Sequence, residues 1–441
     1  MSLPRYPKYK DSGIEWLGEV PEHWLVRALK RVVSTPITDG PHETPDFIDE
    51  GIPFASAESV SSGRLDFSKI RGFISPVDHE RFSQKYKPRR GDIFMVKSGA
   101  TTGVTAIVDN DLDFNIWSPL AAIRCNAENC SRFVLNFLRS SCFLDAVTIG
   151  WNFGTQQNIG MGVIENLYLA TPTLPEQEAI AAFLDQETEK IDALVEEQRR
   201  LIELLKEKRQ AVISHAVTKG LNSDAPMQDS GIEWLGSVPS HWGLKATKKL
   251  FRLVVEPAPD DNDCELLSIY TEIGVRPRKD LEAKGNKATT TDGYWLVKKD
   301  DLIVNKLLAW MGAIGISDYD GVTSPAYDIL RARIPLEPRF YDFLFRCGIC
   351  FSEFRRYSRG IMDMRLRLYF DELGQLPMPY PPVEEQRTIV RYLQAGLTRI
   401  DELTAEATRA IDLLEERRTA LISAAVTGKI DVRGLATEDA A

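Results

Sequence analysis

Cysteine and histidine are both scarce in this sequence, which contains six cysteines and five histidines among 441 residues. A disulfide framework needs a higher density of cysteines in a smaller domain, so the thiols are expected to be reduced, as in a cytoplasm. Cys347 and Cys350 form a CxxC motif with no second pair and no nearby histidine. We interpret them as small residues in a helix interior, with a metal or redox site as the alternative. So few histidines also leave little material for an acid–base or metal constellation.

Long apolar runs and catalytic motifs are absent as well. No stretch approaches the roughly 18 apolar residues that a membrane span requires, and the amino terminus does not have the charged-then-apolar pattern of a signal peptide. The sequence contains no Walker A loop, no Gly-x-Gly-x-x-Gly after a strand, no His-Glu-x-x-His and no Asp/Asn-Pro-Pro-Tyr/Phe motif for amino methylation. The chain is therefore predicted to be non-catalytic, cytoplasmic and unattached to a membrane.

Acidic residues outnumber basic ones, 64 against 54, for a net charge of −10. At first sight this charge argues against binding to nucleic acid. Total charge governs solubility and long-range steering, however, and a local basic surface is compatible with an acidic total. The distribution of charge along the chain therefore matters more than its sum.

An internal repeat dominates the sequence. Residues 11–24, DSGIEWLGEVPEHW, return as residues 229–242, DSGIEWLGSVPSHW, with twelve of fourteen positions identical. A second repeat aligns residues 176–218 with residues 385–427, and both copies begin with Glu-Gln and end with Ala-Val-Thr. The separation between copies falls from 218 to 209 residues, so the middles differ in length by nine residues. Conserved ends around divergent middles indicate one scaffold that carries two different specificities.

The second repeat is predicted to be a long helix in both copies. Prolines precede it, and none interrupts it before Thr218 or Thr427. Apolar residues recur in alternating steps of three and four, which is the heptad pattern of a coiled coil. The helices, each roughly 60 Å long for about 40 residues, are expected to pack on each other as a rigid spacer. The residues assigned to helix–helix packing and partner docking are Leu184, Ile191, Leu194, Leu201, Leu205, Ile400, Leu403, Leu414 and Leu421.

The divergent middles are predicted to be mixed α/β domains with short strands. Residues 90–103 align with residues 299–312 as strand, basic residue, turn and strand, which puts Lys97 and Lys306 at corresponding places. The loop over residues 97–103 is rich in Gly, Ser and Thr. It serves either to cradle a phosphate through its amides and hydroxyls or only to form a tight hairpin.

Both middles carry side chains suited to DNA. Six arginines lie between residues 346 and 367 against two acidic residues, and arginine reads guanine edges and neutralises phosphates. Residues 151–158 of the first middle are rich in Asn and Gln, which suit adenine. A solvated charged face is the alternative interpretation of either cluster. The candidate DNA-binding residues are Lys97, Ser98, Thr101, Asn152, Gln156, Gln157 and Asn158 in the first middle, and Lys306, Arg359, Arg365 and Arg367 in the second.

This layout resembles the specificity subunit of type I restriction-modification systems. The resemblance is carried by the helix entries TLPEQ at residues 173–177 and PVEEQ at residues 382–386, by LISAAVTGKID at residues 421–431, and by the repeated GIEWLGxVP. It covers nearly the whole chain. The helix regions match specifically, whereas the middles match mainly in layout.

The resemblance implies an α+β, pseudo-twofold chain of two target-recognition domains and two long antiparallel coiled-coil helices. Each domain would read one half of a bipartite site in double-stranded DNA, while the helices set the spacing and dock two methyltransferase subunits and endonuclease/translocase subunits. S-adenosylmethionine, ATP and Mg would be bound by those partners, with no cofactor in this chain. The expected segments are residues 1–171 (first recognition domain), 172–219 (first helix), 220–378 (second recognition domain), 379–428 (second helix) and 429–441 (tail).

Two other classes of protein remain open at this point. The chain is alternatively a coiled-coil scaffold that joins other proteins and has no DNA specificity. A hydrolase with an unrecognised site is the third class, which the scarce histidines and the absence of a paired catalytic motif disfavour.

Overall fold

The structure is a computed structural model that describes residues 3–149, 152–153, 157–280, 291–360 and 366–435, with no side chain described in residues 149–157. Helices and strands are mixed along the chain, which confirms the α+β class. The chain divides into two compact units: unit 1 comprises Met1–Gln198 and Arg409–Ala441, and unit 2 comprises Arg199–Thr408. No helix in the described part of the chain is both long and apolar enough to cross a membrane.

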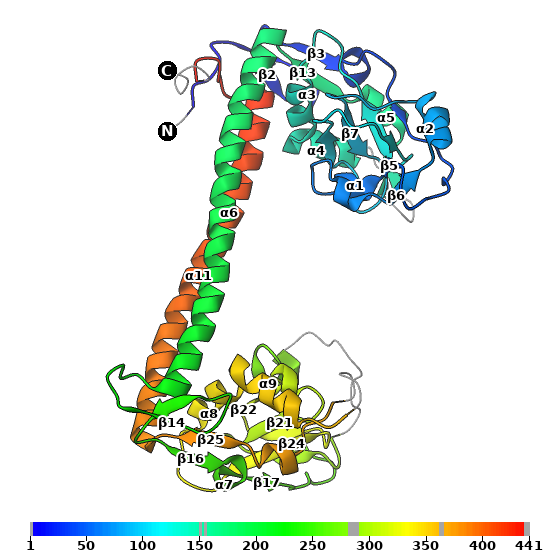
Figure 1. Ribbon diagram of the computed structural model, residues 1–441. Coiled ribbons are helices and arrows are strands. Elements are labelled where there is room, and N and C mark those ends of the chain that lie inside the picture. Colours follow the sequence, from blue (N-terminus) through cyan, green and yellow to red (C-terminus); the bar gives the residue numbers. More distant parts are fainter. Residues whose placement is uncertain (1–2, 150–151, 154–156, 281–290, 361–365, 436–441) are drawn as a thin grey trace. The chain divides into compact units, whose positions relative to one another are not determined.

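Unit 1 is built around a four-stranded antiparallel sheet (Figure 1). Its order is β4 (Thr38–Asp39), β10 (Leu120–Ile123), β7 (Ile93–Val96) and β8 (Thr105–Ile107). Every residue of β7 and β10 is buried. Because successive side chains alternate between the faces of a strand, Ile93 and Met95 join one hydrophobic cluster while Phe94 and Val96 join another. The sheet is therefore covered on both faces, which explains the uninterrupted apolar run.

Shorter elements surround this sheet. The helices of unit 1 are α1 (Ala57–Val60), α2 (Pro76–Ser83), α3 (Ser131–Leu138), α4 (Ser141–Ile149) and α5 (Met161–Asn166). A second sheet has the order β6 (Gly72–Ile74), β5 (Ile52–Ala55) and β9 (Asn115–Ile116). The described residues of the unit also form three two-stranded pairs: β1 (Tyr9–Asp11) with β2 (Glu19–Pro21), β3 (Leu25–Ala28) with β13 (Tyr168–Thr171), and β11 (Asn152–Phe153) with β12 (Gln157–Asn158).

Unit 2 repeats this plan. Its four-stranded sheet has the order β17 (Phe251–Val254), β24 (Tyr327–Ala332), β21 (Leu302–Asn305) and β22 (Ile314–Ile316). The two-stranded pairs are β14 (Met227–Asp229) with β15 (Ser237–Pro239), β16 (Gly243–Ala246) with β25 (Pro377–Tyr380), β18 (Leu267–Tyr270) with β19 (Gly274–Pro277), and β20 (Trp295–Val297) with β23 (Gly321–Thr323). The helices are α7 (Thr247–Leu250), α8 (Pro338–Phe345), α9 (Gly348–Tyr357) and α10 (Phe370–Leu373).

The repeated Glu-Gln at each helix entry ties the helix to its domain. Glu176 accepts hydrogen bonds from Trp24 Nε1 (3.1 Å) and Tyr6 OH (2.8 Å). In unit 2, Glu385 lies 2.7 Å from His241 Nε2. Gln177 accepts from the amide of Cys130 (2.9 Å) before α3, and Gln386 accepts from the amide of Glu337 (2.8 Å) before α8. A buried glutamine thus satisfies an otherwise orphaned amide at the start of a helix in both domains.

The end of each long helix closes on the repeated tryptophan segment of its own unit. Gly428 has a positive φ of 74°, and a Cβ there would lie 2.3 Å from Pro21. Gly220 has a φ of 76° and the same surroundings, with Trp242 3.2 Å from an added Cβ. Glycine is required at Gly428 by both its backbone conformation and its lack of space.

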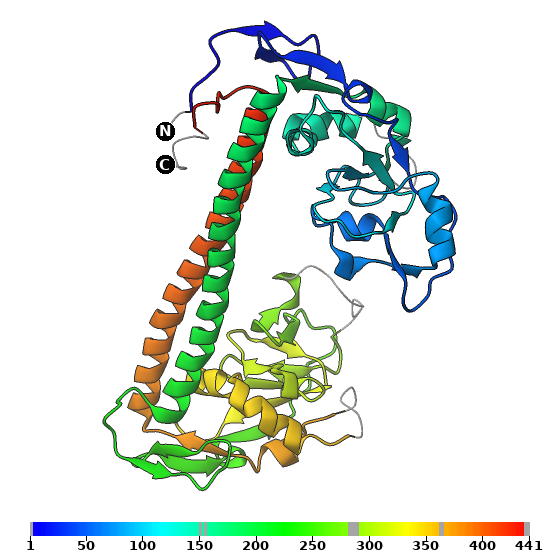
Figure 2. The ribbon, with the colours of Figure 1, turned by 45° about the horizontal axis from the view of Figure 1, so that its top comes forward.

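Two long helices run through the structure, α6 (Leu174–Lys219, 46 residues) and α11 (Val383–Val426, 44 residues). In unit 1 the start of α6 lies beside the end of α11 (Figures 1 and 2), and Arg418 approaches Asp192 to 3.5 Å. In unit 2 the end of α6 lies beside the start of α11, where Arg209 pairs with Asp401. The helices are therefore antiparallel within each unit, and the two ion pairs join positions that correspond in the repeat.

The heptad assignment is wrong in phase at alternate positions. Leu194 and Leu201 are 44% and 40% exposed, so neither packs in the seam to which it was assigned. The residues that are buried instead are Val195 in α6 and Leu397 in α11. Counted from Leu184 and Leu393, the seam follows in steps of four and then three residues, whereas the predicted seam used steps of three and then four. Leu184, Ile191, Leu205 and Ile400 are buried as expected, and Leu403, Leu414 and Leu421 are half-buried.

The CxxC pair is buried, and Cys350 lies within a helix as predicted, whereas Cys347 is the residue that precedes it. Cys347 and Cys350 are free thiols, each 1% exposed, at the start of α9. Burial raises the pKa of the Cys350 thiol, which keeps it protonated and unreactive. Among the described residues no three His, Cys, Asp or Glu side chains gather as metal ligands would.

Candidate nucleic-acid interface

The central strand of each main sheet begins at a buried carboxylate. Asp92 precedes β7 and accepts two hydrogen bonds from Arg124, both 2.7 Å. Asp301 precedes β21 and accepts two from Arg331, at 2.7 and 2.8 Å. The two aspartates are each 1% exposed. A bidentate guanidinium therefore neutralises a buried carboxylate at the same place in both domains.

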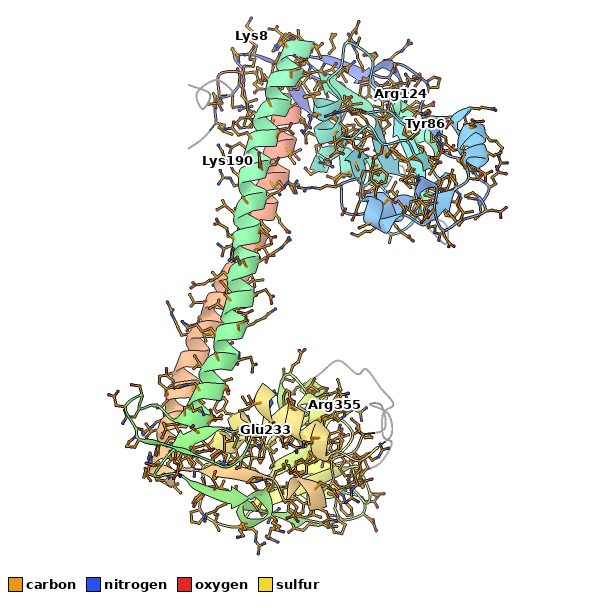
Figure 3. The ribbon with its side chains drawn as sticks, in the orientation of Figure 1. Lys8, Tyr86, Arg124, Lys190, Glu233 and Arg355 are labelled. Carbon is orange, nitrogen blue, oxygen red and sulfur yellow. The ribbon has the colours of Figure 1, made fainter. Side chains whose placement is uncertain are left out.

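Each of these ion pairs raises the pKa of its arginine, mainly through the hydrogen bonds to aspartate. Tyr86 also donates to Asp92, at 2.5 Å, and the guanidinium of Arg124 lies 5.1 Å from the centre of its ring. Figure 3 shows Tyr86 and Arg124 close together in unit 1. These pairs hold the strand from which the candidate DNA-binding loop departs.

The candidate lysine at the other end of each strand is paired with an aspartate. Lys97 donates to Asp39 on β4 at 2.5 Å, and only 12% of its side chain is exposed. Lys306 donates to Asp328 on β24 at 3.1 Å, with 20% exposed. Burial alone would raise the pKa of Asp39, but the hydrogen bonds from Lys85 and Lys97 outweigh it, and the pKa is lowered. The geometry gives both lysines an anchoring role within the sheet, and their contact with DNA remains a prediction.

Replacing Lys97 with alanine is expected to lower the free energy of unfolding by about 1–2 kcal/mol, because the buried Asp39 loses one of its two lysine partners and keeps Lys85 and, at 3.3 Å, His42. The lowered pKa of Asp39 means that its contribution is present above its unfolded pKa and is lost as the pH falls below about 4. Urea unfolding at pH 7 and at pH 3 measures this, and the variant should differ less from wild type at pH 3. The exposed Lys10→Ala serves as the control. A different result would identify Lys97 as a phosphate ligand. In that case the Lys97→Ala variant would have unchanged stability, and its DNA affinity would depend less steeply on salt concentration.

The loop after Lys97 is a hairpin. Its amides at Thr102, Gly103 and Val104 donate to carbonyls of the same hairpin. Gly103 has a φ of 92° and its counterpart Gly312 a φ of 95°, and glycine adopts this conformation without strain. The tight-hairpin interpretation thus accounts for the glycines. Ser98 and Thr101 lie half-buried on this hairpin, and phosphate binding by them stays a prediction.

A second hairpin meets the first in both domains. In unit 1, β11 pairs with β12 through Asn152 and Asn158, and the amide of Ile159 donates to the carbonyl of Lys97 at 2.9 Å. In unit 2, Arg359 and Arg367 exchange two backbone hydrogen bonds of 2.9 Å, and the amide of Leu368 donates to the carbonyl of Lys306 at 2.9 Å. Residues 159 and 368 are 209 positions apart, as are Lys97 and Lys306. Asn158 of the amide-rich cluster and Arg367 of the arginine-rich cluster therefore occupy the same structural position.

The remaining candidates are placed unevenly. Gln156 and Arg365 lie outside the described residues, and Asn152 and Gln157 are described only as members of β11 and β12. Asn158 is exposed and Arg367 half-buried. Arg359 pairs with Glu372, and Arg355 stacks on Trp310 with 5.3 Å to the ring centre. Arg355 and Arg359 are thus engaged within the protein, and DNA binding by the arginine-rich segment stays a prediction beside its solvated-face alternative.

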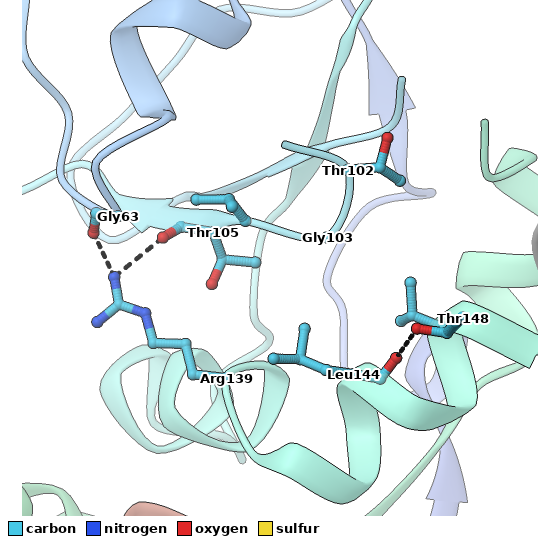
Figure 4. Close-up of a pocket in the computed structure, with 9 residues that line it drawn as sticks. Gly63, Thr102, Gly103, Thr105, Arg139, Leu144 and Thr148 are labelled. Carbon is cyan, nitrogen blue, oxygen red and sulfur yellow. Dashed lines mark hydrogen bonds between the residues drawn. The ribbon is translucent and has the colours of Figure 1, made fainter. Parts of the chain in front are cut away.

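Each domain also has a cavity beside the first hairpin. The cavity in unit 1 has a volume of about 360 Å³ and is lined by Arg139, Leu144 and the hairpin residues 102–105 (Figure 4). Arg139 follows α3 and donates to the carbonyls of Gly63 and Thr105; burial lowers its pKa to about 10. In unit 2, Arg346 follows α8 and donates to the carbonyls of Thr271 and Glu272 beside a cavity of about 1080 Å³. These arginines fix loops of the domain.

Sequence reasoning missed two pairs of acidic residues: Asp92 and Asp301, which hold Arg124 and Arg331, and Asp39 and Asp328, which hold the candidate lysines. Asp92 and Asp301 stand at matching places in the aligned segments, so their correspondence was available as a signal. No such signal exists in the sequence for Asp39 and Asp328. Asp39 lies on an edge strand far ahead of Lys97 in the chain, whereas Asp328 lies on a strand that follows Lys306.

Comparison with known proteins identifies the kind of domain. Residues 21–204 match the family described as type I restriction modification DNA specificity domain. The chain is similar to the putative type I restriction enzyme MjaX specificity subunit of Methanocaldococcus jannaschii, with 22% identity over 95% of this chain and 96% of that protein. It is also similar to the type I restriction enzyme EcoKI specificity subunit of Escherichia coli K12, with 20% identity over 94% of this chain and 90% of that protein.

Two solved structures share the fold. A chain from a study of complex assembly and conformational transition of the type I R-M system superimposes with a TM-score of 0.62, 16% identity and coverage of 94% of this chain and 99% of that chain. The HsdS subunit from Thermoanaerobacter tengcongensis gives a TM-score of 0.54, 16% identity and coverage of 93% and 98%.

Proposed function

From the premise that this chain carries a type I restriction-modification DNA specificity domain and is similar to specificity subunits over nearly its whole length, we propose that it is the DNA-recognition subunit of such a system. Each unit contains a recognition domain that reads one half of a bipartite site in double-stranded DNA. The observation that carries this proposal is the duplicated sheet, whose two joined hairpins occupy equivalent positions but bear unlike side chains.

The contrast between the domains supports different half-sites. The first hairpin is polar in unit 1, where Ser98 and Thr101 lie, and apolar in unit 2, where Leu308 and Met311 are 42% and 48% exposed. Amides and hydroxyls suit adenine and phosphate, whereas arginine suits guanine and apolar groups suit the thymine methyl. One scaffold with two sets of side chains therefore reads two unlike sequences.

The long helices are proposed to set the spacing between the half-sites. At about 1.5 Å per residue, 46 and 44 residues give lengths of roughly 65–70 Å. Half-sites one turn of DNA apart are separated by about 34 Å, well within that reach. The interhelical pairs Asp192–Arg418 and Arg209–Asp401 support an antiparallel packing of defined register.

The helices are also proposed to dock two methyltransferase subunits, with endonuclease/translocase subunits joining them. Exposed leucines on the helices offer the apolar surface that docking requires: Leu194, Leu201, Leu204 and Leu413. In this arrangement the partners bind S-adenosylmethionine, ATP and Mg and perform the chemistry in the cytoplasm, and this chain contributes the specificity.

Replacing both Leu194 and Leu201 with serine is expected to change the free energy of unfolding by no more than about 1 kcal/mol in total, because each is a substitution at an exposed position. The same change should weaken binding of the methyltransferase subunit at least about tenfold through lost apolar contact. Calorimetric titration and urea unfolding measure the two effects. The matched control Val195→Ser, at a buried seam position, should instead cost about 2 kcal/mol of stability. Wild-type affinity in the double variant would contradict docking at these leucines.

Mapping methylated bases in DNA from cells that carry this chain and its companion methyltransferase tests the proposed function. The expected result is methylation at one bipartite sequence with a spacer of constant length. Cells with the methyltransferase alone provide the control and should lack the pattern. A complex that assembles but shows neither site-specific methylation nor DNA affinity would identify the chain as a protein–protein scaffold.

A further inference from the structure

The second hairpin presents one residue in the same register in each domain. In unit 1, Asn158 precedes Ile159, which is 1% exposed and belongs to the core. In unit 2, Arg367 precedes Leu368, which is fully buried in the corresponding core. Because adjacent side chains on a strand point to opposite faces, burial of the second residue turns the first outward. The buried residue and its hydrogen bond to the lysine carbonyl thus fix where Asn158 and Arg367 are presented.

We propose that Asn158 and Arg367 are equivalent specificity-determining residues, each reading a base of a different half-site. This inference rests on the proposed function and deepens it. Asparagine donates to and accepts from the adenine edge in the major groove, whereas arginine donates two hydrogen bonds to guanine. Asn158 therefore reads an adenine in the half-site of unit 1, and Arg367 reads a guanine in the half-site of unit 2.

The surroundings of these two positions favour a role in reading bases over one in packing. Each lies next to the first hairpin of its domain. Ser98 and Asn158 form a β-bridge, and the amide of Leu368, which follows Arg367, donates a hydrogen bond to the carbonyl of Lys306. The two copies of the repeat share the backbone geometry at this position but differ in the side chain, since asparagine and arginine share neither size nor charge. A purely structural position inside a duplicated scaffold would be expected to retain its side chain, as Asp92 and Asp301 do.

The test compares Asn158→Ala and Arg367→Ala in the full complex with the methyltransferase, by mapping methylated bases. Each variant should relax one base pair of one half-site, with discrimination at that position falling on the order of 10–100-fold and the other half-site unchanged. Asn110→Ala and Arg252→Ala are the matched controls, because Asn110 is half-buried and Arg252 is exposed, and both lie in the same domains outside the two hairpins. Thermal unfolding of every variant establishes that it folds.

A reciprocal pair sharpens the result. Asn158→Arg should introduce a preference for guanine at the position that Asn158→Ala relaxes, and Arg367→Asn should weaken guanine at the other. Relaxation of the same half-site by both alanine variants, or wild-type specificity in both, would overturn the inference. If the wild-type complex itself methylates no bipartite site, the proposed function has failed instead, so the two failures are distinguishable.

Discussion

Replacing Asp301 with alanine is expected to lower the free energy of unfolding of unit 2 by about 3 kcal/mol, since truncating one partner of a buried ion pair leaves the other uncompensated. Asp301 is 1% exposed and accepts two hydrogen bonds from Arg331 and one from the amide of Lys298 at 2.9 Å. The value lies at the low end of the range because Arg331 keeps Glu256, at 3.0 Å.

Urea unfolding followed by tryptophan fluorescence measures this loss, with Asp320→Ala as the matched control. Asp320 is exposed and accepts a hydrogen bond from the amide of Lys299, so its replacement should cost less than about 1 kcal/mol. Asp92→Ala should produce the corresponding loss in unit 1, where the carboxylate also holds Tyr86 and Arg124. If Asp301→Ala unfolds like its control, the buried pair does not stabilise the sheet.

Lengthening both long helices by one heptad is expected to lengthen the DNA spacer between the half-sites by about three base pairs. Seven residues add about 10.5 Å of helix, and a base pair rises about 3.4 Å. The insertions belong next to Arg209 in α6 and next to Asp401 in α11, because these residues pair and a heptad in each helix keeps the seam in phase. Both half-sequences should remain those of the wild type, since neither recognition domain is altered.

The control places four residues in α6 alone. That insertion turns the following part of the helix out of the seam, so it should lower stability and methylation together. Mapping methylated bases distinguishes the double-heptad variant from the variant with four residues inserted in α6 alone. Unchanged spacing in a stable double-heptad variant would show that the helices do not set the distance.

Much of the scaffold was accessible from sequence because identical residues recur. The repeated tryptophan segment and the Glu-Gln helix entries predicted a duplicated α+β chain of type I specificity-subunit kind, and the comparisons confirm that resemblance. The long helices were predicted from heptad patterns that no proline interrupts. The phase of the seam was wrong at Leu194 and Leu201, because a stripe with apolar residues at adjacent positions such as Leu194 and Val195 fits two registers equally well.

The site was less accessible than the scaffold. Lys97 and Lys306 were correctly seen as corresponding residues, but a sequence shows a charge without its partner. Only the pairing of strands brings Asp39 to Lys97 and Asp328 to Lys306. The amide-rich and arginine-rich clusters were found separately by composition. The 209-residue offset aligns Asn158 with Arg367, but only the backbone hydrogen bonds show that both lie beside the first hairpin.

The sequence by itself determined the duplication, the helices and the kind of domain, because these depend on residues that recur at regular separations along the chain. The tertiary structure alone decided which leucines are buried, which cations are neutralised within the protein, and that Asn158 and Arg367 lie beside the lysines of the first hairpin. Burial, ion pairing and strand register depend on contacts between segments distant in sequence, and periodicity along a chain carries no information about them.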